Sequence, residues 1–289
     1  KESVGTRYRN AFICAPDEDY VDSDFASQEL VIIAYISGDP VWNKALRHGE
    51  DLHSVCAELV FPDKAWEKNA EPDCAYYHMN NGVMAKQKCK CKGHKRMRNA
   101  VKSINFGLAY GMSEFKLSSQ LSISLQAAKQ LIQDYFKAFP GIGSALNYLG
   151  YFGVTRGYIQ TLAPFFRKRW FPYWRYAKGN ISSHVSKVQY DPTLGSIERA
   201  SKNQPIQGTA ADIIKLSLLM LYWKRHEPEW EDRVKLVMQV HDQNTAISKK
   251  TASKEWFTVM DDTMKEAAKF VIPNGLLGCE TTISPVWTK

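Results

Sequence analysis

The stretch "RNAVKSINFGLAYG", from Arg98 to Gly111, places two cations and two aromatic rings at a constant spacing of four residues. In an α-helix each step of four residues turns about 40° past a full turn, so four such side chains spread over about 120° and form one face. That face carries Arg98, Lys102, Phe106 and Tyr110. A buried face would be aliphatic, and a solvated face would carry charges of both signs. The stretch therefore predicts a helix with a functional face.

The composition is that of a globular protein with a positive charge. The chain has 289 residues, of which 44% are hydrophobic and 24% charged, so it suits one large domain or two smaller ones and excludes a fibrous repeat. The longest strongly apolar run, Leu30 to Ile36, is far shorter than the roughly 20 residues of a membrane span, so we expect no membrane partner. The net charge of +8 favours a polyanionic partner such as nucleic acid.

The cysteines bear on the redox compartment, and the first residues bear on whether the chain is part of a longer polypeptide. The six cysteines do not form a dense, regular framework, and no N-terminal segment resembles a secretory signal, so we expect a reducing, intracellular compartment. The chain starts at Lys1 without Met, in a segment that looks structured. We therefore expect it to be a piece of a longer polypeptide.

Periodicity predicts the main elements along the chain. The alternation in "DYVDSDF" predicts a strand, and helices are predicted for "SQELVIIAYISGD", ended by Gly38, for "DLHSVCAELVF", and for "SLQAAKQLIQDYFKAF", ended by Pro140. The stretch "SIERASKNQPIQGTAADIIKLSLLMLYWKRH" predicts a long helix interrupted at Pro205 and Gly208. "VKLVMQV", "HDQN" and "TAIS" predict a hairpin with His241 and Asp242 at its tip.

Two carboxylates fall at predicted strand ends that are far apart in the sequence. Asp24 and Asp242 offer the hard oxygen ligands that Mg²⁺ prefers, and two such aspartates suffice for a two-metal phosphoryl-transfer site. Each taken alone also suits a solvated turn. The cationic helix face favours the metal site, because Arg98 and Lys102 would clamp a triphosphate.

The far end of that helix suits the rest of a nucleotide. Phe106 and Tyr110 present flat surfaces to a sugar and a base. Gly107 and Gly111 leave room for a nucleobase to approach the backbone.

The Arg98–Gly111 stretch resembles the nucleotide-binding helix of family A DNA polymerases, the bacterial polymerase I type, whose pattern is R-x-x-x-K-x-x-x-F/Y-G-x-x-Y-G. Further motifs occur in the family's order: "DFASQEL" resembles the first palm motif, closest to the mitochondrial branch in its S-Q-E-L form, "ERASKNQPIQGTAAD" the following fingers motif, and "VMQVHDQ" the second palm motif. "GTRYRNAF", "DLHS" and the C-terminal "SPVWTK" also match.

The resemblance implies a template-directed DNA polymerase that joins a primer 3′-hydroxyl to the α-phosphorus of a deoxynucleoside triphosphate and releases pyrophosphate. Asp24 and Asp242 would hold two Mg²⁺ ions and act in catalysis with Lys102, and Glu29 would exclude a ribose 2′-hydroxyl. The residues implied to bind the incoming nucleotide are Glu29, His53, Arg98, Lys102, Phe106 and Tyr110. Those implied to contact DNA are Arg199, Asn203, Gln207 and His241, although Asn203 or Gln207 could instead cap a helix break.

The fold class implied is α/β: a right-hand polymerase palm with an antiparallel sheet built from both ends of the chain, and an inserted, mainly helical fingers domain. We expect palm at 1–39 and 209–289 and fingers at 40–208, with inserts near 63–95 and 173–194. No segment resembles a thumb or an exonuclease carboxylate cluster. We expect the partners to be a DNA primer–template, deoxynucleoside triphosphates, and a thumb portion on the same longer polypeptide or on a separate subunit. The implied setting is a bacterial or phage-infected cytoplasm, or an organelle.

The chain departs from the family at one position beside the second aspartate. The family has Glu there, and this chain has Gln243, which offers no charge to a cation. Asp22, on the same strand face as Asp24, is a candidate to replace part of that charge. A non-catalytic DNA-binding subunit is therefore an alternative, and a related single-subunit RNA polymerase is another, although Glu29 argues against the latter.

A second group of candidate ligands lies in the first insert. Cys74, His78, Cys89, Cys91 and His94 could bind Zn²⁺, with Cys74, Cys89, Cys91 and His94 as the predicted set. The C-x-C spacing is tighter than the usual C-x₂₋₄-C, and lysines crowd the segment. The alternative is a basic loop that contacts DNA phosphates.

Overall fold

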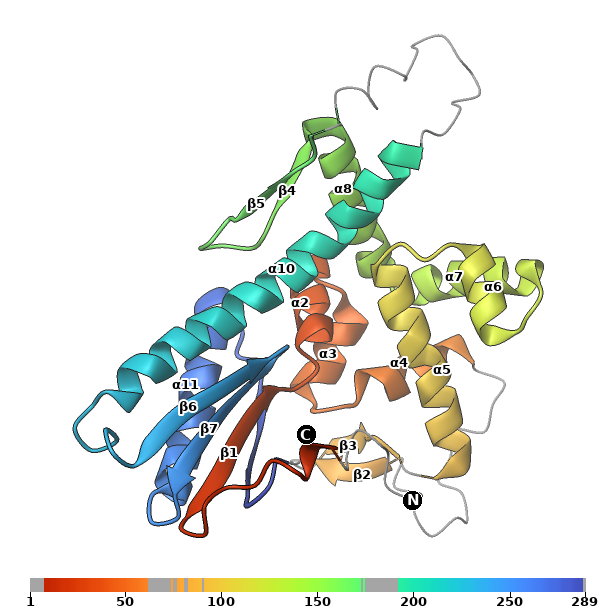
Figure 1. Ribbon diagram of the computed structural model, residues 1–289. Helices are drawn as coiled ribbons and strands as arrows, with labels where there is room; N and C mark the ends of the chain where they lie inside the picture. Colours follow the sequence, from red (N-terminus) through yellow and green to blue (C-terminus); the bar gives the residue numbers. More distant parts are fainter. Residues whose placement is uncertain are drawn as a thin grey trace. The chain divides into compact units, whose positions relative to one another are not determined.

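The computed structural model describes residues 8–61, 74, 77–80, 83–89, 91–172, 174 and 192–287 (Figure 1). The chain divides into two compact units. We call them the sheet unit (1–29, 162–165 and 207–289) and the helical unit (30–161 and 166–206). Residues 173 and 175–191, most of the second predicted insert, lie outside the described residues.

The sheet unit is built on four antiparallel strands in the order β6-β7-β1-β8. The strands are β1 (Glu18–Phe25), β6 (Val234–Val240), β7 (Gln243–Lys249) and β8 (Cys279–Ser284). The predicted strand at the start of the chain and the predicted hairpin are confirmed, and the sheet does combine both ends of the sequence.

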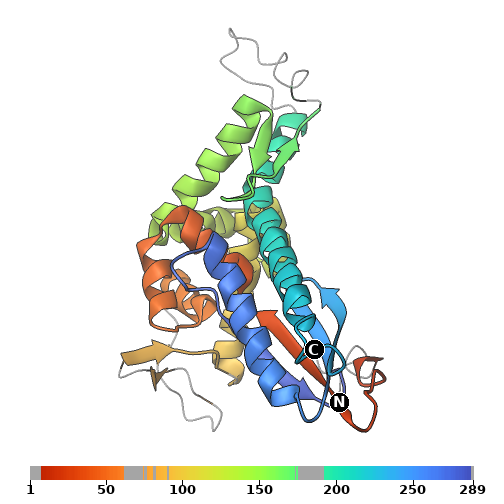
Figure 2. The same ribbon diagram turned by 90° about the vertical axis from the view of Figure 1, so that its left-hand side faces the viewer.

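The two faces of the sheet differ because side chains alternate along each strand. On one face Ser23 Oγ contacts Thr281 Oγ1 at 2.8 Å, and Thr281 Oγ1 donates to Asp261 Oδ1 of α11 (Ser253–Val271) at 2.9 Å. On the same face Asn244 Nδ2 donates to Ser217 Oγ of α10 (Pro192–Arg225) at 2.9 Å. The ribbon views show both helices running beside the sheet (Figures 1 and 2). Asp22 and Asp24 therefore belong to the opposite face.

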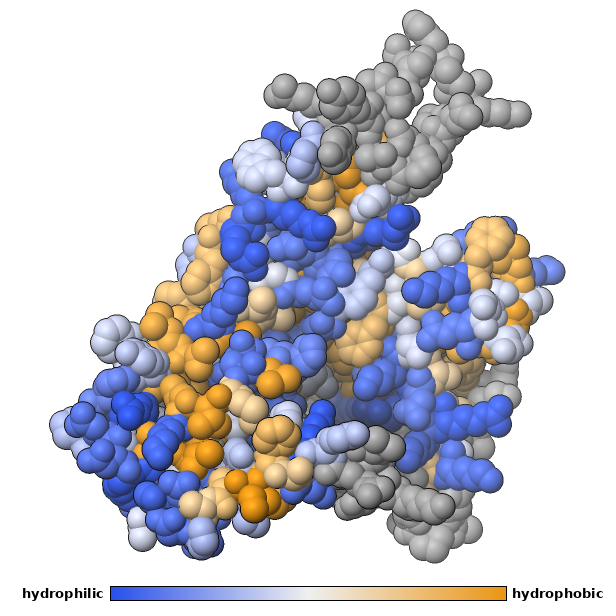
Figure 3. Space-filling view, in the orientation of Figure 1, coloured by the Kyte–Doolittle hydropathy of each residue, from blue (hydrophilic) through white to orange (hydrophobic). Residues whose placement is uncertain are grey.

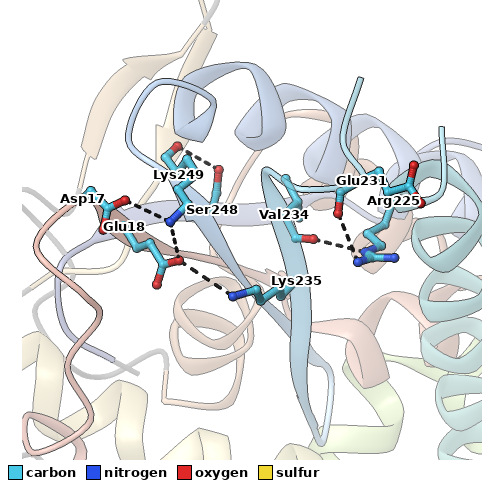
Figure 4. Close-up of polar contacts among 8 residues, drawn as sticks. All are labelled: Asp17, Glu18, Arg225, Glu231, Val234, Lys235, Ser248 and Lys249. Carbon is cyan, nitrogen blue, oxygen red and sulfur yellow. Dashed lines mark hydrogen bonds and ion pairs between the residues drawn. The ribbon is translucent and has the colours of Figure 1, made fainter. Parts of the chain in front are cut away.

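Ion pairs fix the outer ends of the strands (Figure 4). Lys249 Nζ at the end of β7 lies 2.9 Å from Asp17 Oδ2 and 3.0 Å from Glu18 Oε1 at the start of β1. Arg225, the last residue of α10, donates from Nε to the carbonyl oxygen of Val234 at 3.1 Å. The Lys249 ion pairs agree with the β1–β7 register, in which Glu18 pairs with Lys249 and, six residues later, Asp24 pairs with Gln243.

The helical unit contains most of the helices. Gly38, at a φ of 61°, ends the predicted first helix, and the helices predicted around 51–61 and 124–139 are also confirmed. Pro140 starts a further helix at the point where the previous one ends, as its fixed φ suits the first helical position. The helices are α2 (Gln28–Ser37, which begins in the sheet unit), α3 (Pro40–Arg47), α4 (Leu52–Val60), α5 (Lys92–Ala109), α6 (Glu114–Leu121), α7 (Leu125–Ala138) and α8 (Pro140–Arg156).

Two short hairpins complete the described elements of the helical unit. They are β2 (Tyr77–Asn80) with β3 (Val83–Lys86), and β4 (Tyr158–Gln160) with β5 (Lys168–Trp170). The first lies in the segment expected to be an insert, and α5 begins at Lys92, inside that expected insert.

The predicted interruption of the long helix is wrong. α10 runs unbroken from Pro192 to Arg225 with Pro205 inside it. A proline inside a helix removes one backbone hydrogen bond and costs about 3 kcal/mol. Here the residues around it, Ser201, Pro205 and Ile206, are buried, and packing holds the helix through the break in its hydrogen bonding.

The surface varies in character from one element to another (Figure 3). Hydrophilic side chains gather over α5, where Lys92, Lys95 and Lys102 are exposed. Hydrophobic patches lie over β6, where Val237 and Val240 are exposed. Across the described residues, each helix is too short or too polar to cross a lipid bilayer.

Candidate active site

The two predicted metal-binding aspartates are neighbours in the sheet unit. Asp24 lies near the end of β1 and pairs in register with Gln243, and Asp242 occupies the β6–β7 turn. The backbone N–H of Phe25 donates to the carbonyl oxygen of Asp242 at 3.2 Å. Both side chains are half-buried. The sheet thus brings together two carboxylates that lie more than 200 residues apart in sequence, as predicted.

Gln243 is held by a buried carboxylate beneath this pair. Asp22 is only 2% exposed, and its Oδ1 accepts hydrogen bonds from Gln243 Nε2 at 2.9 Å and from Thr245 Oγ1 at 2.6 Å. The amide of Gln243 also lies 3.3 Å from Thr245 Oγ1. Asp22 Oδ1 is therefore engaged by two donors inside the sheet, and the expectation that Asp22 replaces part of the charge of the family's Glu stays a prediction.

A cleft of about 520 Å³ lies beside Asp242 within the sheet unit. Gln207 Nε2 donates to Glu29 Oε1 at 3.3 Å across it, and Gln28 Nε2 donates to the carbonyl oxygen of Ala210 at 3.3 Å. His241 is exposed and has a φ of 54°, which turns the chain sharply before Asp242. The lining residues are Gln28, Glu29, Gln207, Ala210, Ala211, Ile214, Lys215, Gln239, His241 and Asp242.

The helix face predicted to carry two cations and two rings is present on α5, in the helical unit. Lys102 is exposed, and Arg98, Phe106 and Tyr110 are half-buried. The rings of Phe106 and Tyr110 are nearly parallel, with centroids 6.5 Å apart. The other side of the helix is apolar and packs inward, with Val101, Ile104, Leu108 and Ala109 buried. The helix is thus anchored by one side and offers its cations and rings on the other.

Arg98 is oriented by a bidentate ion pair. Its Nε and one terminal nitrogen donate to the two carboxylate oxygens of Asp51 at 2.7 and 2.8 Å. Asp51 also caps α4 by accepting from the backbone N–H of Ser54 at 2.9 Å. Burial raises the pKa of Asp51, but the hydrogen bonds from Arg98 and Ser54 outweigh it and hold that pKa below its usual range. Lys102 is consequently the more available of the two cations.

His53 is buried next to this pair. It is 4% exposed, its Nδ1 lies 3.0 Å from Asn105 Nδ2, and its ring meets that of Phe106 edge to face at 5.6 Å. Burial lowers its pKa to about 4; Asp51 opposes the shift, and the positive charges of Arg98 and Lys102 add to it. His53 is therefore neutral at pH 7, and a role at the phosphates would use a ring N–H in place of a positive charge.

The two glycines of the α5 motif meet protein side chains. A Cβ on Gly107 would collide with the Met112 side chain, and one on Gly111, at a φ of 74°, would lie 2.9 Å from Arg199 Cγ. The left-handed φ of Gly111 already favours glycine. The turn after the helix thus accounts for Gly111, and the approach of a nucleobase to the two glycines stays a prediction.

Three of the predicted DNA contacts share a face of α10. Arg199, Asn203 and Gln207 recur every four residues, and Arg199 and Gln207 are exposed. The helix continues through all three positions, so none of them caps a break.

The four predicted zinc ligands come together in the helical unit. The ligand atoms of Cys74, Cys89, Cys91 and His94 all lie within 4.8 Å of one another, and all four residues are buried. The side chain of His78 lies outside the described residues.

Comparison with known proteins places these features in a family. The model of DNA polymerase family A matches residues 77–289. The chain belongs to DNA polymerase family A. The region matched includes α5, α10 and the β6–β7 turn, and so contains most of the residues described above.

The relatives are longer than this chain. It is 29% identical over 270 residues to the thermostable DNA polymerase I of Thermus filiformis, covering 93% of this chain and 27% of the relative. It is 32% identical over 270 residues to DNA polymerase I of Streptococcus pneumoniae, covering 93% and 26%. The chain thus spans about a quarter of the length of the curated relatives that it matches.

A solved structure of the family shares the fold. The POL domain of Pol1 from M. smegmatis, in complex with DNA primer-template and dNTP, matches 100% of this chain and 43% of its own, with a TM-score of 0.76 and 25% identity. The fold class predicted for this family A chain, a palm with an antiparallel sheet and a mainly helical fingers region, is confirmed. The roles of individual site residues, and the domain boundaries at 39/40 and 208/209, stay predictions.

Sequence reasoning missed the partners of the family A motif residues. Asp51 precedes His53 in the "DLHS" motif, and its position as an N-cap was a readable signal. Thr245 and Met112 gave no such signal, because their contacts with Asp22 and Gly107 arise only in the folded chain.

Proposed function

We propose that this chain carries the catalytic centre of a template-directed DNA polymerase, which adds deoxynucleoside monophosphates to a primer 3′-hydroxyl. The observation that carries the proposal is that Asp24, near the end of β1, and Asp242, in the β6–β7 turn, lie at the same end of the sheet, beside a cleft lined by Glu29 and Asp242. Family membership supports the reaction class, and the solved relative bound to primer-template and dNTP supports the substrates.

The donor set fits a pair of Mg²⁺ ions. Asp24 near the end of β1 and Asp242 in the β6–β7 turn are half-buried carboxylates, and Mg²⁺ prefers oxygen ligands combined with waters and substrate phosphates. When bound, such ions activate the attacking hydroxyl and neutralise charge on the reacting phosphate. Gln243 adds no negative charge to this set, so the two aspartates would hold the metals without help from the next residue.

The helical unit supplies the groups for the triphosphate and the sugar. Lys102 offers an exposed ammonium to the phosphates. Arg98 keeps further N–H groups after its two bonds to Asp51, and that pair fixes the direction in which they point. Phe106 and Tyr110 form a continuous aromatic surface one turn further along. Positioning and charge neutralisation are the main contributions that phosphoryl transfer needs from a protein.

The length of the relatives bears on how a duplex would be held. The solved relative and the curated relatives have residues beyond those that this chain matches. We infer that a thumb portion, on the same longer polypeptide or on a separate subunit, completes the grip on the primer–template. Added Lys and Arg contacts should tighten binding of a fluorescent primer–template and steepen its salt dependence. Equal affinities and slopes with and without that portion would contradict the inference.

Gln243 keeps one alternative open, a DNA-binding subunit without catalysis. Primer extension by the chain together with its thumb portion separates the two functions. The polymerase proposal expects templated addition that requires Mg²⁺ and follows the template base. Tight primer–template binding with no nucleotide addition, under conditions where a polymerase I extends the same primer, would favour the non-catalytic function.

A further inference from the structure

We propose that Cys74, Cys89, Cys91 and His94 form a structural zinc site that fixes the N-terminal end of α5. Their ligand atoms, three sulfur atoms and one imidazole nitrogen, lie within 4.8 Å of one another. Cys₃His is one of the ligand sets of closed, four-coordinate zinc sites in proteins. The polymerase reaction proposed above uses none of these residues, so the inference stands independently of it.

Two nitrogen–sulfur distances in the cluster are close to those of a tetrahedral site. His94 Nδ1 lies 3.2 Å from Cys91 Sγ and 3.6 Å from Cys74 Sγ. With Zn–S near 2.3 Å and Zn–N near 2.1 Å, tetrahedral angles put sulfur and nitrogen about 3.6 Å apart. A neutral imidazole nitrogen has one lone pair and accepts one hydrogen bond well. Two sulfur atoms converging on the same nitrogen are better explained by a shared metal ion than by two thiol hydrogen bonds.

The burial of these four residues argues against the alternative of a solvated basic loop. Cys74, Cys89, Cys91 and His94 are 4%, 3%, 0% and 2% exposed. A loop that only contacts DNA phosphates has no need to bury three cysteines and a histidine against one another. A buried zinc ion with these four protein ligands would have no open coordination position, which is typical of structural rather than catalytic zinc.

The local backbone explains how the site is assembled. Cys91 is the N-cap of α5, and its Sγ lies 3.2 Å from Nδ1 of His94, which occupies the third helical position. N-cap and third-position side chains meet at the start of a helix, as they do in a capping box. Cys89 follows β3, and Cys74 comes from the segment before β2. The ion would thus tie Cys74 and Cys89 to the first turn of α5.

The lysines that crowd the segment favour the metal-bound state. Three thiolates, one neutral imidazole and Zn²⁺ carry a net charge of −1, and the positive end of the α5 helix dipole lies at the site. Lys88, Lys92 and Lys95 are exposed, so they can offset that charge while their ammonium groups stay hydrated. The charge pattern that weighs against a metal site in the sequence is therefore compatible with one in the structure.

The proposed zinc site would also affect the face of α5 that carries Arg98 and Lys102. His94 lies one helical turn before Arg98, and Arg98 is held by Asp51. The end of β3 is also tied to the start of α4, because the backbone N–H of Asp51 donates to the carbonyl oxygen of Lys86 at 2.7 Å. Zinc would thus fix the beginning of the helix whose next turns carry Arg98 and Lys102.

Metal content tests the proposal directly. The whole chain, purified without chelator and with a thiol reductant, should contain about one zinc ion per molecule by plasma mass spectrometry. Cys89→Ser and His94→Ala should lose most of it, and Cys14→Ser, a cysteine outside the cluster, should retain it. His94→Cys should also retain zinc, because Cys₄ is a structural zinc set. Equal metal content in Cys89→Ser and Cys14→Ser, or none in the wild-type chain, would overturn the proposal.

Cobalt substitution keeps the test valid if a variant folds poorly. Replacing zinc by Co²⁺ in the wild-type chain should give the intense visible bands of tetrahedral cobalt and the ultraviolet charge-transfer bands of thiolate ligands. A chelator should lower the melting temperature of the wild-type chain and of Cys14→Ser but leave that of His94→Ala unchanged. Weak octahedral cobalt bands, or a disulfide within the cluster in reduced and anaerobically prepared protein, would show that the cluster is not a zinc site.

Discussion

The aspartate pair of the sheet unit and the cysteine–histidine cluster of the helical unit are two ligand sets of opposite character. Asp24 and Asp242 are half-buried hard oxygen ligands beside a cleft of about 520 Å³. The cluster consists of soft ligands that are at most 4% exposed. The first set suits ions that keep waters and bind a substrate, and the second suits one ion held permanently.

The two ligand sets depend on the fold in different ways. The aspartates are joined by a sheet register that the whole sheet unit maintains, so the carboxylates can be changed without loss of the scaffold. The cysteines lie on loops and on the first turn of one helix, so the proposed ion itself would be a main source of their order. Substitutions at the first site should affect activity, and substitutions at the second should affect stability.

The largest effect is expected at the aspartates. Asp24→Asn or Asp242→Asn should reduce primer extension by about 10³-fold or more, which is about 4 kcal/mol, because a metal ligand acts on the charge of the reacting phosphate. Affinity for primer–template should stay within a few-fold, since the duplex is held mainly through its backbone. Extension and fluorescence anisotropy measure the two quantities, with Asp232→Asn, an exposed aspartate, as the control. Near-normal extension by either variant would show that the aspartate it replaces is not part of the site.

The second prediction concerns Gln243, where the family has Glu. A carboxylate at 243 would face Asp22 Oδ1, now 2.9 Å from Gln243 Nε2, and the two like charges would destabilise the sheet unless one is protonated. Protonating a glutamate of pKa about 4.3 at pH 7 costs about 3.7 kcal/mol, which bounds the loss. Gln243→Glu should therefore lower the free energy of unfolding by up to about 4 kcal/mol at pH 7, and by little near pH 4.

Urea unfolding at several pH values measures this loss. Asp22→Asn combined with Gln243→Glu should recover most of the stability, because Asn can donate to the new carboxylate. Gln133→Glu, at an exposed position on α7, is the matched control and should change little. A pH-independent loss, or no recovery in the double variant, would show that Asp22 and residue 243 are not coupled by charge.

Much of the sheet unit could be predicted from sequence because its signals are local. Alternation marks β1, and "HDQN" between two apolar runs marks the hairpin that carries Asp242. The polar partners beneath the site could not be predicted in the same way. The contacts of Asp22 with Gln243 and Thr245 join residues more than 220 positions apart, and only the β1–β7 register brings them together.

The helices that sequence reasoning missed have a different explanation. α8 contains four glycines, which lower helix propensity, yet the glycines let the helix pack closely on α10. A Cβ on Gly150 would lie 2.7 Å from Glu198 Cγ, and one on Gly153 would collide with Ser201. α11 is a different case, since Trp256, Met260, Met264 and Val271 follow a helical period that the sequence did offer.

The third prediction concerns pH and the buried His53 of the helical unit. Its pKa is lowered to about 4 in the folded chain, against about 6.5 in the unfolded chain, so between these values the unfolded state binds more protons. Stability should be fully present above pH 6.5 and fall on acidification by about 3 kcal/mol by pH 4. His53→Gln should flatten that part of the profile.

Urea unfolding from pH 4 to 7.5 checks the size and the sign. His226→Gln replaces an exposed histidine and should leave the profile as in the wild-type chain. Asp51, whose pKa is lowered, adds a further loss of stability at still lower pH, so Asp51→Asn separates the two contributions. An unchanged slope between pH 6.5 and 4 in His53→Gln would mean that the buried ring takes up a proton in the folded state.

The smallest effect is expected in sugar selectivity. Glu29 lines the cleft beside Asp242 and accepts a hydrogen bond from Gln207, which fixes its side chain across the space that we propose for the sugar. Shortening it in Glu29→Ala should raise the use of ribonucleotides relative to deoxynucleotides by about 10- to 100-fold, since a pocket that discriminates by space alone yields about that much. The ratio of kcat/KM values in single-nucleotide incorporation measures the change.

Two further variants separate the bulk of Glu29 from its position. Glu29→Gln keeps the side chain's size and can still pair with Gln207, so it should stay close to wild type in sugar selectivity. Gln207→Ala keeps the glutamate but frees it to move, so its effect should be smaller than that of Glu29→Ala. If Gln207→Ala admitted ribonucleotides as well as Glu29→Ala does, the hydrogen bond rather than the bulk would set selectivity. If neither changed the ratio, the sugar would lie elsewhere and the cleft beside Asp242 would lose its assignment to the incoming nucleotide.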